Sequence, residues 1–517
     1  AAGFCLSLYP GAQIGHSMHL SNIIQALQAL QRRGSRGIGL VKRWKRPNGY
    51  REVLAISLPL VASMGAITLM QFTDRMFLAN YSVDAISAAL PAGIASFTTI
   101  SFFMGVASYT NTFVAQYTGA EARSRVSDSL WQGIYFSLIS ALVLALLALV
   151  SGPLFDLIGH SERIRALEVE YFNILTLGAG LVVLSSAMAS FFTGRGLTRV
   201  VMAAHITGAL VNIPLDYCLI NGAWVFPELG IRGAGIATVT ASGCIVIFLG
   251  VLIFGRSARA AFKTWPRRAF DRELFRRLLH YGMPSGVQLF MEIFAISFFV
   301  QMLGRVGDLE LAASNIVLSI ETVSFLPMVG FHIGTAILVG QAVGKGRPED
   351  GEYATTSGLH VTLVYMALVA GVFLGVPERL LGLFRPGHQT IAEYAEVLAL
   401  GVPLMRFVAI YCFFDALNLI FSGALKGAGD TRFIMFTIAM LSLGVMIIPV
   451  YIAVEVLSAG LFTVWVLATL YICGLGVAFL LRYLNGNWKR MKVIEEQAAP
   501  LTGVSQEAAG PGGQGVF

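Results

Sequence analysis

Four acidic residues stand inside long apolar stretches of the sequence, where a charge is expensive. Asp74 lies in MQFTDRMFLAN, Glu292 in GMPSGVQLFMEIF and Asp415 in YCFFDALNLIFSGALKG, and Glu321 is a fourth candidate. A carboxylate at the centre of a lipid bilayer costs about 2.5–3.5 kcal/mol on insertion scales, so it normally faces a cavity and has a function there. We predict that Asp74, Glu292 and Asp415 bind cations and that Glu321 lines the same cavity.

Polar residues at helical spacing accompany two of these carboxylates. Gln288 precedes Glu292 by four residues, so the amide and the carboxylate share a helix face. Tyr411 and Asn418 flank Asp415 at spacings of four and three residues, which places all three on one side of a helix. Two carboxylates with neutral oxygens suit Na⁺, a cation that prefers oxygen ligands, and Glu292 and Asp415 are our candidates for such a site. The same pair could instead share a proton. Both alternatives stay open from the sequence.

Aromatic and sulfur-containing side chains surround the acidic positions. Aromatic faces attract cations and Met packs adaptably, so these surroundings suit a lipophilic organic cation. The alternative is that most of these side chains fill space between helices or face lipid. The predicted wall of the substrate cavity consists of Gln288, Met291, Phe294, Tyr411, Asn418, Phe72 and Glu321.

Two further carboxylates, Asp216 and Glu455, fall near the ends of apolar segments that we expect at the outer membrane surface. A solvated carboxylate is inexpensive at that depth, so we expect structural roles for both.

The composition predicts an all-α polytopic membrane protein. The mean hydropathy is +0.72, and only 13% of the 517 residues are charged, against about a quarter in globular proteins. Apolar stretches of about 20 residues recur, each long enough to cross a bilayer as a helix. Twelve spans are expected, at 53–80, 85–117, 129–150, 167–193, 200–221, 233–254, 283–304, 310–341, 355–376, 393–425, 433–453 and 459–483.

The two halves of the sequence repeat each other. The segment GRGLTR that begins at Gly194 returns as GAGDTR at Gly427. Since each half has six spans, both halves enter the membrane from the same side as parallel repeats, which is the plan of many secondary transporters. Four residues recur at a constant distance of 225 positions, namely Pro59, Gly105, Gln116 and Gly119, which match Pro284, Gly330, Gln341 and Gly344.

The basic residues gather on one side of the predicted spans. The net charge is +7, and most Lys and Arg residues fall in the segments that share a side with the N-terminus. This asymmetry is the positive-inside rule, so we expect both termini in the cytoplasm and no nucleic-acid binding. The basic run VKRWKR is expected to rest on the anionic inner leaflet, preceded by a short amphipathic helix from Ser21. The five cysteines have no pairing or metal spacing, and we interpret them as small buried hydrophobes.

These features divide the chain into five parts. We predict a basic cytoplasmic extension at 1–51, an N-lobe of spans 1–6 at 52–254, a cytoplasmic amphipathic linker at 255–282, a C-lobe of spans 7–12 at 283–485 and a disordered cytoplasmic tail at 486–517. In the linker, Asp271 is placed to cap a short helix whose Leu274, Phe275, Leu278 and Leu279 face the lipid surface.

With these residues in view, the chain resembles the multidrug and toxic compound extrusion (MATE) family, in particular its NorM-like branch. The similarity covers residues 51–485 and rests on FTDRMFLAN, the Q-x-x-G that closes spans 2 and 8, NIPLDY, RELFRRLLHYGMP, MEIF and DALNLIFSGALKGAGDTR. The resemblance implies two six-helix lobes in a V around a central cavity. It also implies an antiporter that expels organic cations while Na⁺ or H⁺ enters, without a cofactor.

The resemblance also assigns roles to single residues. Glu292 and Asp415 match the family's cation-site carboxylates in the C-lobe, and Asp74 matches the N-lobe carboxylate implicated in coupling. One departure is that Arg75 and Phe77 follow Asp74 where relatives usually carry small residues before a Gly. This departure bears on coupling and substrate range.

Other functions fit less well. A lipid-linked oligosaccharide flippase of the same superfamily is the alternative, but such a cavity would favour clustered Arg and Lys for pyrophosphate, and the candidates here are acidic. A membrane-embedded enzyme lacks support because no HExxH or GxSxG motif occurs. A channel is disfavoured because scattered carboxylates form no ring for a filter. We expect a monomer in the cell inner membrane that binds small organic cations.

Overall fold

The computed structural model describes residues 40–156, 160–385 and 394–495, and within these ranges the regular structure is helical throughout. Within the part of the chain that the structure describes, twelve helices are long and apolar enough to cross a membrane, as predicted. The amphipathic helix expected from Ser21 lies outside the described residues.

The first six spans form the N-lobe. Span 2 is interrupted at Tyr109, and the short helices α2 (Leu40–Lys45) and α7 (Ser151–Asp156) lie outside the spans. The spans are α3 (Tyr50–Tyr81), α4 with α5 (Val83–Ser108, Thr110–Gly119), α6 (Arg123–Ala148), α8 (Glu162–Thr193), α9 (Thr198–Asn221) and α10 (Ile231–Phe254).

The second six spans form the C-lobe, and α11 (Arg256–Phe262) lies in the linker before them. Span 11 contains two π-helical turns, Ser442–Ile447 and Ile452–Val456, on either side of α18 (Ile448–Tyr451). The short α15 (Pro377–Gly382) follows span 9. The spans are α12 (Arg272–Val306), α13 (Asp308–Gly344), α14 (Pro348–Gly375), α16 (Ala395–Ala428), α17 continued to the second π turn (Thr431–Val456) and α19 (Leu461–Leu484).

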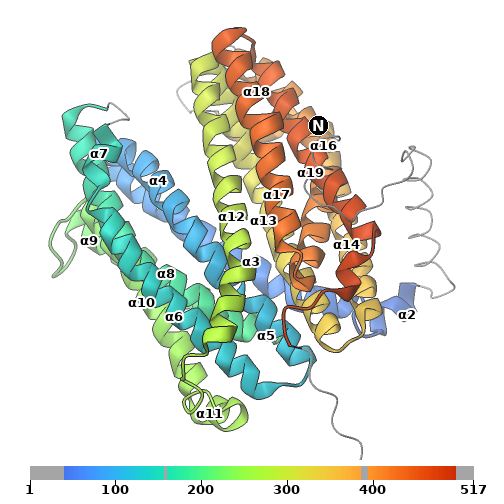
Figure 1. Ribbon diagram of the computed structural model, residues 1–517. Coiled ribbons are helices and arrows are strands. Elements are labelled where there is room, and N and C mark those ends of the chain that lie inside the picture. Colours follow the sequence, from blue (N-terminus) through green and yellow to red (C-terminus); the bar gives the residue numbers. More distant parts are fainter. Residues whose placement is uncertain (1–39, 157–159, 386–393, 496–517) are drawn as a thin grey trace, which may run out of the picture.

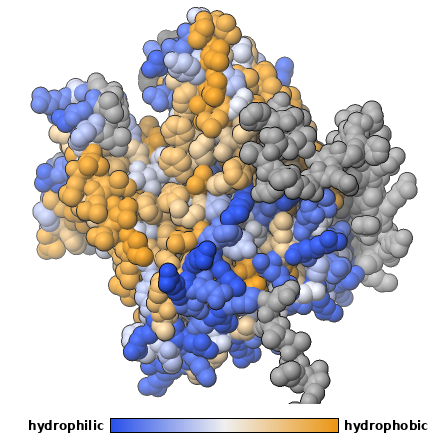
Figure 2. Space-filling view, viewed as in Figure 1, coloured by the Kyte–Doolittle hydropathy of each residue, from blue (hydrophilic) through white to orange (hydrophobic). Residues whose placement is uncertain are grey.

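The two lobes form a V (Figure 1). They diverge toward the end of the molecule that carries α7 and α18, here called the open end, and meet around α5, here called the closed end. Hydrophobic side chains cover much of the visible face along the helices, and hydrophilic side chains gather mainly at the closed end (Figure 2). The closed end is the end that the positive-inside rule predicts to be cytoplasmic, and this orientation stays a prediction.

The repeated Gln and Gly residues form the seam between the lobes at the closed end. A β-carbon at Gly119 would overlap the carbonyl oxygen of Gln341 and lie 2.8 Å from its carbonyl carbon. A β-carbon at Gly344 would meet the carbonyl group of Gln116 in the same way, 2.7 Å from its carbon. Only glycine permits two helix backbones to approach this closely, which is how membrane helices often pack.

The side chains of the same two glutamines form hydrogen bonds with the other repeated motif, GRGLTR in the N-lobe and GAGDTR in the C-lobe. Gln116 Nε2 donates to the carbonyl oxygens of Gly427 at 3.0 Å and Ala428 at 3.3 Å. Gln341 Nε2 donates to the carbonyl oxygen of Gly194 at 2.8 Å. The Q-x-x-G of each lobe therefore binds the G-x-G of the other lobe, and the sequence repeat reflects a pseudo-twofold contact.

The linker helix differs from the prediction. Asp271 is the N-cap as expected, since its Oδ1 accepts from the amide of Leu274 at 3.0 Å. The helix is not short, because α12 continues without a break to Val306. Leu274 and Leu278 are 1% and 2% exposed and pack in the N-lobe core instead of facing lipid. The expected lipid-facing orientation was wrong for these two residues because the N-lobe offers the same apolar surface.

The beginning of the predicted disordered tail is ordered. A 3₁₀ turn at Asn487–Arg490 follows α19. Val493 and Ile494 are then buried in the N-lobe core, and the amide of Val493 donates to Gln116 Oε1 at 3.0 Å. Glu495 pairs with Arg125 and Arg277. The prediction of disorder was wrong for 486–495 because these residues bury apolar side chains across the seam. Residues 496–517 lie outside the described range.

The segment before α3 contacts the opposite lobe in its turn, because it packs against α14 of the C-lobe. Arg43 in VKRWKR is only 4% exposed. Its Nε donates to Ser357 Oγ at 3.2 Å, and its guanidinium lies 4.4 Å from the centroid of the Tyr353 ring on α14 of the C-lobe. The expectation that this run rests on the leaflet was wrong for Arg43, because Tyr353 and Ser357 provide a protein site for it.

Candidate cation sites in the two lobes

The C-lobe brings three of the predicted carboxylates together from three helices. Glu292 comes from α12, Glu321 from α13 and Asp415 from α16. Asp415 lies within electrostatic range of both Glu292 and Glu321. Asp415 is 5% exposed, and the two glutamates are half-buried. This acidic cluster inside a membrane bundle requires neutralisation by a cation, a proton or a basic group.

Neutral oxygen and nitrogen groups complete the cluster as the helical spacing predicted. Gln288 Nε2 donates to Glu292 Oε1 at 3.3 Å, and Asn418 Nδ2 donates to Asp415 Oδ1 at 3.2 Å. Tyr411, buried on α16, lies close to Glu321 of α13. The side chains of Gln288, Tyr411 and Asn418 therefore surround the carboxylates.

Two basic residues lie near the cluster. Lys426, at the end of α16, is close enough to Glu292 for an electrostatic interaction. Sequence reasoning did not identify Lys426 as a neighbour of Glu292, because the two residues lie on different helices and far apart in the sequence. His332 on α13 has Nδ1 at 2.8 Å from the carbonyl oxygen of Leu419. The ring thus reaches α16 one turn from Asp415.

The N-lobe contains a second acidic pair. Asp74 on α3 is 7% exposed and accepts from Thr238 Oγ1 of α10 at 3.3 Å. Asp216 on α9 is 0% exposed and interacts directly with Asp74. Both carboxylate oxygens of Asp216 and Oδ1 of Asp74 lack a well-formed hydrogen bond among the described residues. Two buried carboxylates side by side need a cation or a shared proton between them.

The position of Asp216 corrects an expectation. The sequence predicted a solvated structural carboxylate, whereas the structure buries Asp216 beside Asp74 inside the N-lobe. The available signal was Asn212, one helical turn before Asp216 in NIPLDY, which interacts with it. The matching expectation for Glu455 is confirmed, since Glu455 pairs with Arg305 at 2.7 Å at the open end.

The apolar candidates for the cavity wall differ in their placement. Phe72 is 63% exposed, and its helical position is roughly opposite Asp74. Phe294 is partly exposed and stacks with Phe290, with ring centroids 5.9 Å apart. Met291 packs against the C-lobe core. Their contact with a substrate stays a prediction.

The described residues contain no group of three or more His, Cys, Asp or Glu side chains arranged to hold a metal ion. The side chains of Gln288, Tyr411 and Asn418 carry neutral oxygens beside the C-lobe carboxylates, and a Na⁺ site at Glu292 and Asp415 stays a prediction.

The sequence is similar to a family of known transport proteins in both lobes. The MatE family model matches residues 59–218 and 284–452, one match for each lobe. The protein named "Probable multidrug resistance protein NorM" of Pseudomonas aeruginosa is 27% identical over 388 residues, which is 74% of this chain and 78% of that protein. The protein of the same name from Thermotoga maritima is 26% identical over 458 residues, covering 87% and 96%.

Solved structures share the fold. A transporter of the MOP superfamily from Pyrococcus furiosus has a TM-score of 0.77 at 19% identity and covers 89% of this chain and 99% of its own. A multidrug resistance MATE transporter in an outward-facing conformation has a TM-score of 0.76 at 20% identity and covers 89% and 98%. With a family match in each lobe, NorM-like relatives and this twelve-helix fold, the chain belongs to the MatE family of multi-pass membrane proteins.

Proposed function

We propose that this protein is a secondary antiporter that exports lipophilic organic cations in exchange for Na⁺ or H⁺ by alternating access. The observation that carries the proposal is the presence of a buried acidic site in each lobe of a two-lobed bundle that is joined at one end only. The names of the NorM relatives support drugs as substrates. The closed end is cytoplasmic in this proposal, so the state described here is open to the outside.

The acidic clusters provide a site for which the coupling ion and the organic cation compete, as an antiporter requires. A ligand shifts a conformational equilibrium only if it binds the two states with different affinity. An ion held by Glu292 and Asp415 neutralises the C-lobe cluster, and an organic cation that enters from the other side offers the same neutralisation. In this scheme the two ligands favour different orientations and exclude each other. Each elementary charge moved across 100 mV is worth about 2.3 kcal/mol.

Ethidium efflux from cells that express the full chain tests the proposal. We expect Asp415→Asn to abolish efflux while the protein still reaches the membrane. The matched control is Asp308→Asn, which removes an exposed carboxylate at the start of α13 and leaves efflux unchanged. Wild-type efflux in the Asp415→Asn variant would overturn the role of the C-lobe cluster.

Reconstituted vesicles then identify the coupling ion. Efflux driven by an imposed Na⁺ gradient at constant pH would assign Glu292 and Asp415 to a metal-ion site. Efflux driven only by a pH gradient would assign the carboxylates to proton exchange. A folded, fully reconstituted protein that transports ethidium under neither gradient would favour the lipid-linked oligosaccharide flippase.

A further inference from the structure

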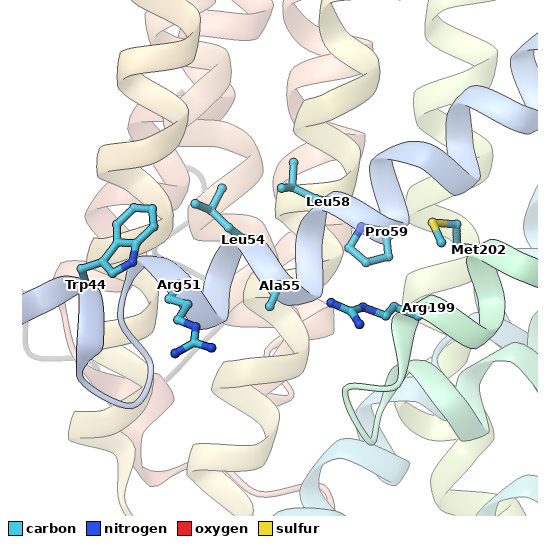
Figure 3. A pocket seen from close by; sticks show the side chains of 8 residues that line it. All are labelled: Trp44, Arg51, Leu54, Ala55, Leu58, Pro59, Arg199 and Met202. Atoms are coloured by element: carbon cyan, nitrogen blue, oxygen red, sulfur yellow. The ribbon is translucent and has the colours of Figure 1, made fainter.

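The structure contains two equivalent grooves, one in each lobe, that the proposed transport mechanism does not use. The first groove, of about 360 Å³, lies between the start of α3 and the start of α9 (Figure 3). The second groove, of about 690 Å³, lies between α12 and the start of α17. Both lie at the ends of the spans that we expect to be cytoplasmic.

The two grooves are built from matching residues. From the first span of each lobe come an Arg, a Leu, a second apolar residue and a Pro, and from the fifth span come an Arg and a Met. The first set is separated by 225 positions between the lobes and the second by 233. The pairs are Arg51 with Arg276, Leu54 with Leu279, Leu58 with Met283, Pro59 with Pro284, Arg199 with Arg432 and Met202 with Met435. A random surface hollow would not recur in this way.

Each groove has a cationic end. In Figure 3, Arg51 and Arg199 extend toward the side of α3 that carries Ala55, and Arg199 reaches across from α9. All four groove arginines are exposed. Within the described parts of the chain, none of them forms an ion pair with a carboxylate. Arg432 lies beside the ring of His280, with Nη2 3.2 Å from Nδ1.

The rest of each groove is apolar and open. Leu58 is 52% exposed and Met283 is 43% exposed, and each lies about two helical turns along its helix from the groove arginine of the same span. Arg199 and Arg432 are also the second residues of α9 and α17, whose N-terminal amides favour an anion. A groove that combines two guanidinium groups with exposed apolar side chains, at the end of the spans that we expect to be cytoplasmic, is complementary to a phosphate that carries an acyl chain.

We propose that each lobe binds one anionic phospholipid of the cytoplasmic leaflet in its groove. The two arginines bind the phosphate, and the Leu or Met wall and the Pro turn contact the acyl chain. A soluble phosphate would use only the cationic end, so the apolar wall favours the lipid.

Native mass spectrometry of the purified full-length protein, titrated with dioleoylphosphatidylglycerol, tests the proposal. The wild-type protein should bind two lipids tightly. Arg51→Gln with Arg199→Gln should remove one, and Arg276→Gln with Arg432→Gln should remove the other, each with at least tenfold weaker binding at the altered groove. Replacement by Lys at the same positions preserves charge and should give intermediate binding, which provides a variant that folds if the Gln variants do not.

Matched controls separate the groove from general charge attraction. Arg123→Gln with Arg256→Gln removes two exposed arginines at the same end of the molecule, outside both grooves, and should leave both lipids bound. Equal loss of lipid in the control and groove variants would overturn the proposal. Equal affinity for glycerol phosphate, which has no acyl chains, or for dioleoylphosphatidylcholine would also overturn it.

Discussion

The Gln–Gly seam makes a quantitative prediction about alternating access. Gly119 and Gly344 face the backbone of the opposite lobe, and a β-carbon at either position would overlap a carbonyl group. Backbone carbonyls of packed helices cannot rotate away, so the lobes must separate slightly. Overpacking of this kind typically costs about 1–3 kcal/mol.

The cost of Gly119→Ala falls on one conformation only. The overlap exists while the closed end is sealed and disappears when the lobes separate there. The equilibrium should therefore shift toward separation at this end by about 1–3 kcal/mol, which is about 5–150-fold. Gly344→Ala should act in the same direction because its contact is the pseudo-twofold equivalent.

A cysteine introduced at the buried position Ser285, where the two lobes touch, can measure this shift in the equilibrium. Ser285 is fully buried, and its hydroxyl has no hydrogen-bond partner among the residues that the structure describes. Its carbonyl oxygen would lie 2.7 Å from a β-carbon at Gly105 of the other lobe. In a background without native cysteines, Ser285→Cys should react with a maleimide only when the lobes separate. The reaction rate follows the population of the separated state when closing is fast.

We expect Gly119→Ala and Gly344→Ala to increase the maleimide reaction rate of Ser285→Cys about 5–150-fold. The control is Gly93→Ala in α4, where a β-carbon meets nothing within 4 Å; this change gives the same gain in helix propensity and should leave the rate unchanged. Unchanged rates in both seam variants would refute the reasoning, and so would an equal increase in the control.

Three further predictions follow from contacts at the closed end. Gln116→Leu leaves buried carbonyl oxygens unpaired, at about 1–3 kcal/mol each, and should lower the melting temperature in detergent; an unchanged melting temperature would contradict this. Burial tends to raise the pKa of Glu495, but the Tyr117 hydrogen bond and the Arg125 ion pair outweigh it and hold that pKa below its usual value. The Glu495 carboxylate therefore stabilises the docked tail fully above about pH 4.3, the pKa of a free Glu. This stabilisation is lost as the pH falls through the lower pKa that Glu495 has in the docked tail. In the wild type, trypsin should cleave the tail faster at acidic pH, when the rate is expressed relative to that of a reference peptide. In Glu495→Gln this relative rate should not depend on pH. Asp271→Ala removes the N-cap of α12 and should speed amide hydrogen exchange in its first turn, corresponding to about 0.5–2 kcal/mol, whereas Asp271→Asn, which can still cap, should not.

Much of the architecture was predictable from local sequence. Apolar length gives the twelve spans, because a helix must satisfy its own backbone in lipid. The fixed distance between repeated Gln and Gly residues gives two equivalent lobes. The spacing of Gln288 with Glu292 and of Asn418 with Asp415 gives hydrogen bonds that the structure contains, because residues four and three apart share a helix face.

Contacts between distant helices were decided only by the tertiary structure. Asp216 looked solvated until α9 was packed against α3, and the pairing with Asp74 joins positions far apart in the sequence. Leu274, Val493 and Ile494 carry apolar side chains that lipid or protein could cover equally well. Hydropathy does not distinguish these surroundings, because lipid tails are as apolar as a helix surface. The sequence by itself therefore determines which segments enter the membrane, and the close approach of glycine backbones and polar groups determines which of their faces meet.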